Sequence, residues 1–257
     1  MTKRDKTIKE LKRDFFQGIG VPKETAFKPD EFQLEAIKLL EERVDTLVIA
    51  PTGAGKTYIA IEAIRATMAR GEKAVYTAPL KAVSNAKYAD FKRRFEPEYS
   101  VGILTGDRKI ASDSSVVVAT TEIYRNELYS GEGRYSLVVL DEFHYLADPQ
   151  RGPVWEESII LSPQTATLLL LSASISNAQQ VAAWIEEVRK KPVRIVTVKE
   201  RPVALRLGFL HSDFGVIPLL DDDGQILPEV NHYYSGDRMF FPKGARRGSY
   251  RGNRRRG

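Results

Sequence analysis

The chain contains no cysteine among its 257 residues, which excludes disulfide bonds and cysteine-ligated zinc sites. Histidine occurs only at His144, His211 and His232, which are too few and too scattered for a histidine-rich metal site. No apolar run approaches the roughly 18 residues of a membrane span. The charged N-terminus also lacks the apolar stretch of a signal peptide. We therefore expect a protein of the cytoplasm without a membrane partner.

Positive charge is concentrated at one end of the chain. The formal net charge is +5, but residues 243–257, KGARRGSYRGNRRRG, contain seven Lys or Arg and no acidic residue. The rest of the chain carries 32 basic and 34 acidic residues and is nearly neutral. Flexible segments that interleave arginine, glycine and an aromatic residue bind single-stranded nucleic acid. A solubilising tail or an interdomain insert is the alternative.

Apolar runs rich in β-branched residues recur at intervals that fit alternating strands and helices. The pattern predicts strands at 45–50, 73–78, 100–105, 114–120, 136–141, 166–172 and 193–198. Helices are predicted at 56–70, before Gly71, and at 177–191, before Pro192. Strands that are apolar throughout and alternate with helices form a mostly parallel sheet covered on both faces. The fold class is therefore α/β, and ligands are expected beyond the carboxyl ends of the strands.

The alternation weakens after residue 205. Residues 208–229, GFLHSDFGVIPLLDDDGQILPE, predict a hairpin with its turn at Asp223-Gly224. We accordingly divide the chain into an N-terminal extension (1–25), an α/β domain (26–199), a linker with the hairpin (200–231) and a flexible Arg/Gly-rich tail (232–257).

A glycine-rich loop, APTGAGKT (50–57), follows the first predicted strand and opens the first predicted helix. Glycines in such a loop allow successive backbone N–H groups to point at phosphate oxygens. Lys56 would then reach the β and γ phosphates of ATP, and the Thr57 hydroxyl would bind Mg²⁺. A glycine-rich turn that merely precedes Lys-Thr is the alternative, but the strand and helix on the correct sides favour a phosphate-binding loop. The nucleotide-binding residues predicted in this loop are Thr52, Gly53, Ala54, Gly55, Lys56 and Thr57.

Two adjacent carboxylates, Asp141 and Glu142, follow the apolar strand within SLVVLDEFHYL (136–146). Charges at the end of a buried strand are costly unless something pairs with them. Beside a phosphate loop, Asp141 can bind Mg²⁺ and Glu142 can orient or deprotonate an attacking water. An acid pair that only favours a helix N-terminus is the alternative. Together with Lys56, the two carboxylates are the predicted catalytic residues of an ATPase.

Several motifs of the chain together resemble those of one known protein family. APTGAGKT, DEFH (141–144) and SAS (172–174) resemble motifs I, II and III of superfamily 2 helicases of the DExH-box type. FKPDEFQLEAI (27–37) resembles the family's adenine-reading element, and APLKAVSNAKYADF (78–91), TGD (105–107) and TTEIYRNELY (120–129) resemble its nucleic-acid-contacting segments. Residues 141–160 and ERPVAL (200–205) are most similar to the superkiller-like, exosome-associated RNA helicases. The resemblance covers about residues 25–230 and implies a RecA-like domain.

The resemblance also implies roles for individual residues. Phe27 would stack on adenine and Gln33 would hydrogen-bond the edge of the base, although Gln33 also fits a helix capping box with Asp30. Contacts with the sugar–phosphate backbone carry no base-sequence information. The resemblance assigns such contacts to Lys81, Thr105, Gly106, Thr120 and Thr121.

A further implied role is coupling between ATP hydrolysis and strand binding. His144 would link the nucleotide site to Ser172 and Ser174 of the SAS motif. Each of these residues alone has a simpler explanation, as a polar or small residue near a strand end.

Complete members of the family have two RecA-like domains with ATP between them. ERPVAL resembles the linker to the second domain, whose arginine finger is not evident in the 257 residues. Such a finger is worth roughly 10³- to 10⁵-fold in rate. We therefore expect the chain alone to bind ATP and to be nearly inactive.

The sequence thus predicts the ATP-binding motor domain of an ATP-dependent RNA helicase. Its cofactors would be ATP and Mg²⁺, and its partner a nucleic acid, with RNA favoured over DNA. The alternatives are a DNA repair helicase of the same branch and a nucleotide-gated nucleic-acid-binding module without translocation. The oligomeric state is left open.

Overall fold

The computed structural model describes residues 7–17, 19, 28–131, 134–198 and 206–234. The chain divides into a larger unit, residues 26–203, and a smaller unit, residues 1–25 with 204–257. Phe27, the ERPVAL segment and residues 235–257 of the basic tail lie outside the described residues. Across the described ranges, no helix has both the length and the apolar character that a membrane span needs.

The larger unit is built on an eight-stranded sheet with the strand order β4-β3-β5-β2-β6-β7-β1-β8. Every pairing is parallel except that of β4 with β3. The strands are β1 (Asp45–Ile49), β2 (Ala74–Ala78), β3 (Val101–Thr105), β4 (Arg108–Ile110), β5 (Val116–Thr120), β6 (Leu137–Leu140), β7 (Thr167–Ser172) and β8 (Val193–Thr197). The seven predicted strands and the mostly parallel α/β sheet are confirmed, and the short antiparallel edge strand β4 is an addition.

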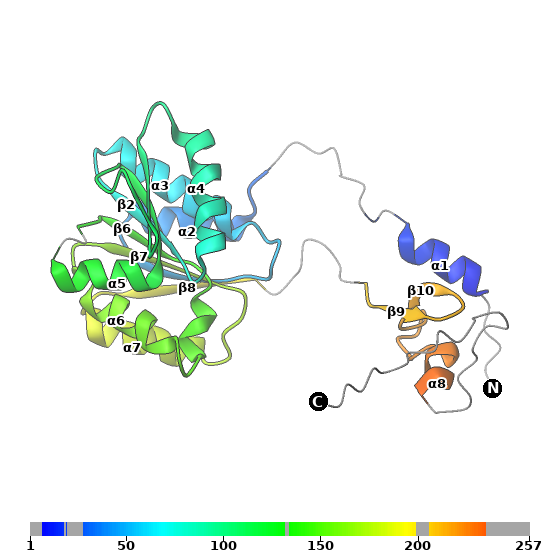
Figure 1. Ribbon diagram of the computed structural model, residues 1–257. Coiled ribbons are helices and arrows are strands. Elements are labelled where there is room, and N and C mark those ends of the chain that lie inside the picture. The colour runs from blue at the N-terminus through cyan, green and yellow to red at the C-terminus, as the bar shows by residue number, and fades with distance from the viewer. Residues whose placement is uncertain (1–6, 18, 20–27, 132–133, 199–205, 235–257) are drawn as a thin grey trace, which may run out of the picture. The chain divides into compact units, whose positions relative to one another are not determined.

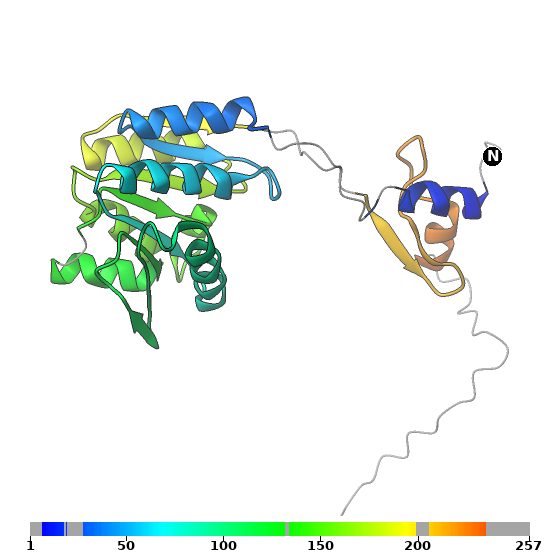
Figure 2. The same ribbon diagram turned by 90° about the horizontal axis from the view of Figure 1, so that it is seen from above.

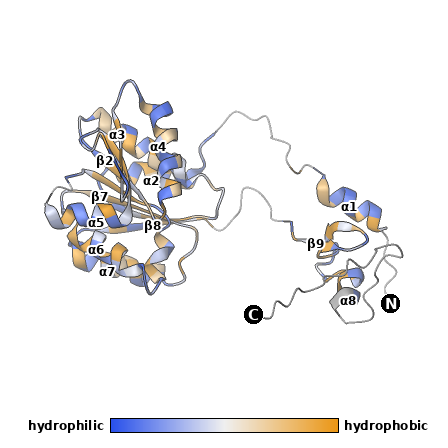
Figure 3. Cartoon of the chain, viewed as in Figure 1, coloured by the Kyte–Doolittle hydropathy of each residue, from blue (hydrophilic) through white to orange (hydrophobic). Residues whose placement is uncertain are grey.

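Helices cover both faces of this sheet (Figure 1, Figure 2). One face packs against α2 (Glu31–Glu41), α3 (Lys56–Ala69) and α4 (Lys81–Phe95). The other face packs against α5 (Thr121–Ser130), α6 (Gly152–Leu161) and α7 (Ala178–Arg189), with the short 3₁₀ helix η1 (Phe143–Ala147) beside them. Because successive residues of a strand point to opposite faces, strands buried on both faces must be apolar throughout. Figure 3 shows this apolar sheet between helices with polar outer sides.

A buried ion pair lies at the amino end of β1. Arg189 Nε of α7 donates to Asp45 Oδ2 at 2.6 Å, and both side chains are almost fully buried. The guanidinium also donates to the carbonyl oxygens of Ser162 and Ala166, at 3.0 and 2.8 Å. The second oxygen of Asp45 accepts the Leu168 N–H at 2.9 Å. The pair therefore connects β1, β7 and α7 at the edge of the sheet opposite to the strand carboxyl ends.

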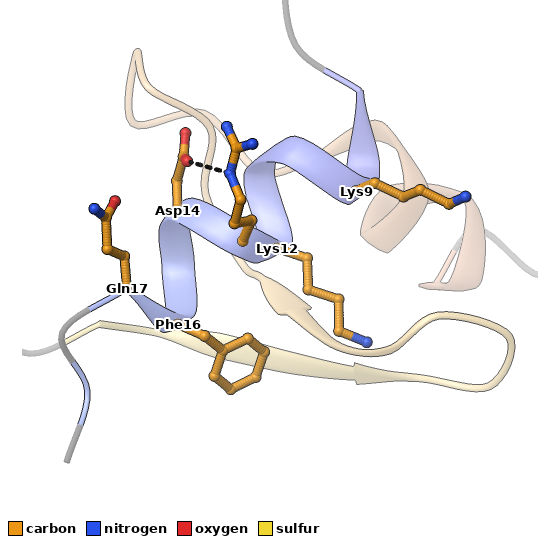
Figure 4. A pocket seen from close by; sticks show the side chains of 6 residues that line it. Lys9, Lys12, Asp14, Phe16 and Gln17 are labelled. Atoms are coloured by element: carbon orange, nitrogen blue, oxygen red, sulfur yellow. Dashed lines mark ion pairs between the residues drawn. The ribbon is translucent and has the colours of Figure 1, made fainter. Parts of the chain in front are cut away.

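The smaller unit joins the two ends of the chain. It contains α1 (Ile8–Phe16), β9 (Gly208–His211), β10 (Gly215–Pro218) and α8 (Pro228–Tyr234). Leu11 of α1 shares a core with Ile217, Leu227 and Val230, and Lys12 Nζ donates to the Phe214 carbonyl oxygen at 2.6 Å. Side chains of α1 and of its C-cap residue line a hollow beside the hairpin: Lys9, Lys12, Arg13, Asp14, Phe16 and Gln17 (Figure 4).

The segment contains two turns, and the predicted turn at Asp223-Gly224 is one of them. There, Gly224 N donates to the Asp221 carbonyl oxygen at 3.1 Å and Leu220 bridges to Ile226 in an antiparallel sense. The other turn was not predicted. The strands β9 and β10 pair from Gly208↔Pro218 to His211↔Gly215, so this turn lies at residues 212–214.

We predict that Arg189→Met destabilises the protein by about 3–5 kcal/mol, because among the described residues it leaves the buried Asp45 carboxylate with only Lys191 Nζ, at 3.5 Å, as a cationic partner. Urea unfolding followed by circular dichroism would measure the loss. Arg194→Met, at an exposed position of β8, is the matched control and should change stability by less than about 0.5 kcal/mol. Equal losses in the two variants would contradict the role of the pair.

Candidate nucleotide-binding site

The sequence motifs gather at one edge of the sheet. The strands that precede them are parallel, and the carboxyl ends of parallel strands meet at the same edge. The glycine loop follows β1, Lys81 lies just after β2, Thr105 ends β3, Thr120 ends β5, Asp141 follows β6 and Ser172 ends β7. The topology therefore brings together segments that are more than a hundred residues apart.

The glycine loop runs from β1 to the start of α3. Gly53 has φ +87° and Gly55, the N-cap of α3, has φ +80°. Glycine adopts these left-handed conformations without strain. A Cβ at Gly53 would meet no heavy atom within 4 Å, whereas a Cβ at Gly55 would lie 2.4 Å from Gln33 Nε2. Both positions therefore need glycine because their φ angles are positive. Gly55 is also required because a Cβ there would clash with Gln33.

Gln33 provides that close contact. Its side chain is 2% exposed, and Nε2 donates to the carbonyl oxygens of Ala54 and Gly55, at 3.1 and 3.3 Å. Its Oε1 accepts the backbone N–H of Asp30 at 2.9 Å, which is the reciprocal bond of a capping box. Gln33 therefore connects the start of α2 to the glycine loop.

Lys56 lies over the loop. Its Nζ donates to the carbonyl oxygens of Ala50 and Pro51, at 2.6 and 3.2 Å. Burial lowers the pKa of Lys56 below its ordinary value, and the negative charges of Glu142 and Asp141 oppose that shift. The lysine is thus near enough to the acidic pair to interact with it electrostatically.

Asp141 has an unexpected partner on β2. Its Oδ2 accepts a hydrogen bond from the hydroxyl of Tyr76, and its Oδ1 accepts the Glu142 N–H at 2.9 Å. Tyr76 is fully buried, and burial followed by the charge of Asp141 raises the pKa of the phenol well above its ordinary value. Tyr76 therefore remains a protonated donor that orients one carboxylate oxygen. Glu142 has φ +53°, a left-handed conformation at the turn from β6 into η1.

Thr57 also has a partner that the sequence did not indicate. Lys87 Nζ of α4 donates to Thr57 Oγ1 at 2.8 Å and lies 5.4 Å from the ring centroid of Tyr76. Burial lowers the pKa of Lys87, and the charge of Asp141 opposes this. Two features of the sequence could have indicated these contacts. One is the tyrosine within the predicted strand 73–78, and the other is the lysine within the helix that follows it.

His144 and part of the SAS motif lie beside one hollow of the larger unit. His144 Nδ1 is 3.4 Å from Glu142 Oε2, and its ring stacks on Tyr145. Ser172 is buried and donates to the Ser174 carbonyl oxygen at 3.2 Å. His144 and Ser174 both line a hollow of about 910 Å³. In the part of the chain that the structure describes, no hydrogen bond joins His144 to either serine.

Three of the five predicted nucleic-acid contacts lie together. Lys81 Nζ and Thr105 Oγ1 both contact Asp107 Oδ1, at 3.2 and 2.9 Å. A Cβ at Gly106 would lie 3.6 Å from Lys81 Nζ, so the glycine adjoins the lysine. The three threonines are nevertheless buried, because Thr105 is 6%, Thr120 5% and Thr121 0% exposed. Their side chains are not accessible to a nucleic acid in this structure.

The residues present fit a magnesium–nucleotide complex. Mg²⁺ prefers oxygen ligands and takes only one or two from the protein when phosphates and water supply the others. Thr57 and Asp141 provide a hydroxyl and a carboxylate, and Tyr76 contacts the carboxylate while Lys87 contacts the hydroxyl. Within the described residues, no group of three or more His, Asp or Glu side chains could bind a metal ion.

The glycine loop between β1 and α3 and the order of the parallel strands define a P-loop domain of the RecA-like α/β fold. Residues 30–181 match the model of the DEAD/DEAH box helicase family. The chain belongs to that family, and the DExH-box and superkiller-like resemblance of its motifs is confirmed by the relatives that follow.

Several curated helicases are similar to the chain. It is 42% identical to a chloroplastic DExH-box ATP-dependent RNA helicase of Arabidopsis thaliana, over 77% of this chain and 17% of that protein. It is 39% identical to the probable helicase HelY of Mycobacterium tuberculosis, over 89% of this chain and 26% of that protein. The antiviral helicase SKI2 of Saccharomyces cerevisiae is 38% identical, over 78% of this chain and 16% of that protein. The chain thus spans about a quarter or less of each relative's length.

A solved structure supports the fold. The helicase MrfA bound to DNA has a TM-score of 0.56 and 16% identity, over 74% of this chain and 29% of that chain. At this identity the likeness shows the fold alone.

We predict that Gly55→Ala is more destabilising than Gly53→Ala, because both replace a glycine with positive φ but only the first brings a Cβ against Gln33. Urea unfolding of the single variants and of each combined with Gln33→Ala would measure the coupling. Gln33→Ala should offset part of the cost of Gly55→Ala, by roughly 0.5–3 kcal/mol, and leave that of Gly53→Ala unchanged. If Gln33→Ala is additive with Gly55→Ala as well as with Gly53→Ala, a Cβ at position 55 does not clash with Gln33, which would contradict the prediction.

Proposed function

We propose that the chain is the ATP-binding motor domain of an ATP-dependent RNA helicase of the DExH-box, superkiller-like branch, active in the cytoplasm. The observation that carries the proposal is the position of Lys56, which lies over a glycine loop and interacts electrostatically with Asp141 and Glu142. This arrangement unites a phosphate-binding cation with the acidic groups that hydrolysis requires.

The residues of the site then have distinct roles. The backbone N–H groups of the loop, from Thr52 to Gly55, donate to phosphate oxygens, and Lys56 turns from the carbonyl oxygens of Ala50 and Pro51 to the β and γ phosphates. Thr57 and Asp141 bind Mg²⁺, which when bound offsets the negative charge of the phosphates. Glu142 orients or deprotonates the attacking water.

Base recognition would use Phe27 and Gln33. For Gln33 to hydrogen-bond adenine, its amide must give up one of its bonds to Asp30, Ala54 or Gly55. The same amide then connects the occupied base site to the glycine loop. Coupling would use His144, which lies 3.4 Å from Glu142 and lines the same hollow as Ser174.

The nucleic acid would contact the surface formed by Lys81 and Gly106. Lys81 has an exposed ammonium, and its partner Asp107 is also exposed, so a phosphate can replace the carboxylate at little cost. Thr105, Thr120 and Thr121 are buried and would contribute through backbone groups or after a rearrangement. RNA is favoured because the Arabidopsis relative is named as an RNA helicase.

A DNA helicase of the same branch is the second candidate, because the contacts assigned to Lys81 and Gly106 are with the sugar–phosphate backbone and carry no base-sequence information. Both substrates present the same backbone charge to Lys81. In either case, unwinding and rapid turnover would belong to the whole protein, with the second RecA-like domain implied by the family. The 257-residue chain alone would bind ATP and hydrolyse it slowly.

We predict that Lys56→Ala weakens binding of ATP–Mg²⁺ by about 10- to 100-fold, because it removes a charge-assisted contact with the phosphates. Glu142→Gln should retain binding and lose the residual hydrolysis. Isothermal titration and phosphate release would measure the two effects. The control is Lys38→Ala on α2, an exposed lysine, which should match the wild type. Equal ATP affinity in Lys56→Ala and the wild type would reject the site.

We also predict that Lys81→Ala weakens binding of single-stranded RNA and reduces the slope of log K against log salt by about 0.7, the value for one phosphate contact. Fluorescence anisotropy over a range of salt concentrations would measure the slope. Lys92→Ala, near the opposite end of α4, is the control. A slope in Lys81→Ala that equals the wild-type slope would place the nucleic acid elsewhere, and competition between matched RNA and DNA strands would decide the preferred substrate.

A further inference from the structure

Lys87 contacts a predicted ligand of the magnesium ion. Its Nζ donates to Thr57 Oγ1 at 2.8 Å, and Thr57 is the hydroxyl that the phosphate-binding loop supplies to the metal. The lysine reaches this position from α4, a different element from the loop, and its side chain is only partly exposed. Lys87 lies within the segment 78–91, whose resemblance implies contacts with a nucleic acid and no role at the nucleotide site.

The same lysine interacts with the second predicted ligand. The negative charge of Asp141 attracts the Lys87 ammonium, as do those of Asp90 and Glu142, whereas Arg94 repels it. The ammonium lies 5.4 Å from the centroid of the Tyr76 ring, and the hydroxyl of that ring donates to Asp141 Oδ2. A continuous set of contacts therefore runs from Thr57 through Lys87 and Tyr76 to Asp141.

A lysine ammonium in this position has the properties of a cation in a metal site. It is positively charged, it donates to the hydroxyl oxygen that would bind the metal, and it is attracted by the carboxylate that would bind the metal. An ammonium and a divalent cation that share one hydroxyl oxygen repel each other strongly in a partly buried site. The two cations therefore exclude each other at Thr57.

We propose that Lys87 is a positioning residue that occupies the cation position between Thr57 and Asp141 in the nucleotide-free protein and leaves it when Mg²⁺ binds. Tyr76 keeps Asp141 oriented in both states, because its hydroxyl bonds the oxygen on the side of β2. The inference rests on the proposed function, since it assumes that Thr57 and Asp141 bind the metal. It adds an internal competitor that makes Mg²⁺ binding weaker than the ligands alone would allow.

Substitutions of Lys87 and of Tyr76 should change the Mg²⁺ concentration needed for nucleotide binding in opposite directions. Removing the Lys87 charge removes the competitor, so less Mg²⁺ is needed to promote nucleotide binding. Removing the Tyr76 hydroxyl leaves Asp141 without its orienting donor, so more Mg²⁺ is needed. Changes in contacts that orient a metal ligand typically alter metal affinity by about 10- to 100-fold.

The test is the binding of a fluorescent ADP analogue at increasing concentrations of free Mg²⁺, which requires no hydrolysis. In Lys87→Met, the Mg²⁺ concentration at half-maximal enhancement should fall by roughly 5- to 10-fold relative to the wild type. In Tyr76→Phe, it should rise by about 10-fold. Lys92→Met removes a lysine from the same helix, beyond the site, and should leave the value unchanged.

The possible outcomes separate the two proposals. If the wild type binds the analogue without any response to Mg²⁺, or fails to bind it, the proposed function is rejected. If the wild type responds and Lys87→Met behaves like Lys92→Met or needs more Mg²⁺, Lys87 is not a competitor and this inference is overturned. Lys87→Gln retains a hydrogen-bond donor without the charge and decides the question if Lys87→Met does not fold. It should show the same decrease, and a wild-type value in folded Lys87→Gln would equally overturn the inference.

Discussion

The parallel direction of the strands is the constraint on which the candidate site depends. Seven strands run the same way, so seven carboxyl ends lie at a single edge. Helices cover both faces of the sheet, and this edge is the place where loops can diverge and meet a ligand. Lys56 and Asp141 are 85 residues apart in sequence, and their interaction follows from the fact that β1 and β6 flank β7 in the same direction.

The sequence predicted the central strands because each is buried on both faces and is therefore rich in apolar residues. It did not predict β4, whose three residues RKI lie half-exposed or exposed at the edge and have no apolar pattern to detect. The turn at Asp223-Gly224 was predictable because this dipeptide is a strong local signal. The turn at residues 212–214 was missed, because β10 packs against α1, about 200 residues earlier, and that contact leaves no local pattern.

Within the site, the glycine loop and the acidic pair were predictable because their chemistry is local in sequence. The contacts that orient them were not. Tyr76 reaches Asp141 from a neighbouring strand, Lys87 reaches Thr57 from α4, and Gln33 reaches the loop from α2. Each contact depends on the packing of two elements, and the sequence fixes only which side of its own element a residue occupies. For the same reason the burial of Thr120 and Thr121, at the junction of β5 with α5, could not be foreseen.

The charges explain how the carboxylates at the end of β6 remain stable. Asp141 and Glu142 follow an apolar strand, where isolated charges are costly. Two lysines of the same chain interact with them: Lys56 from the glycine loop and Lys87 from α4. Two positive charges face two negative ones, so the site is balanced without a ligand. A nucleotide with its metal brings both a cation and an anion, and these can replace both lysine interactions at once. Under the proposed function, Lys56 would then face phosphate and Lys87 would be released from Thr57. The same charges that balance the free protein would thereby make the entry of the metal and of the phosphates depend on each other.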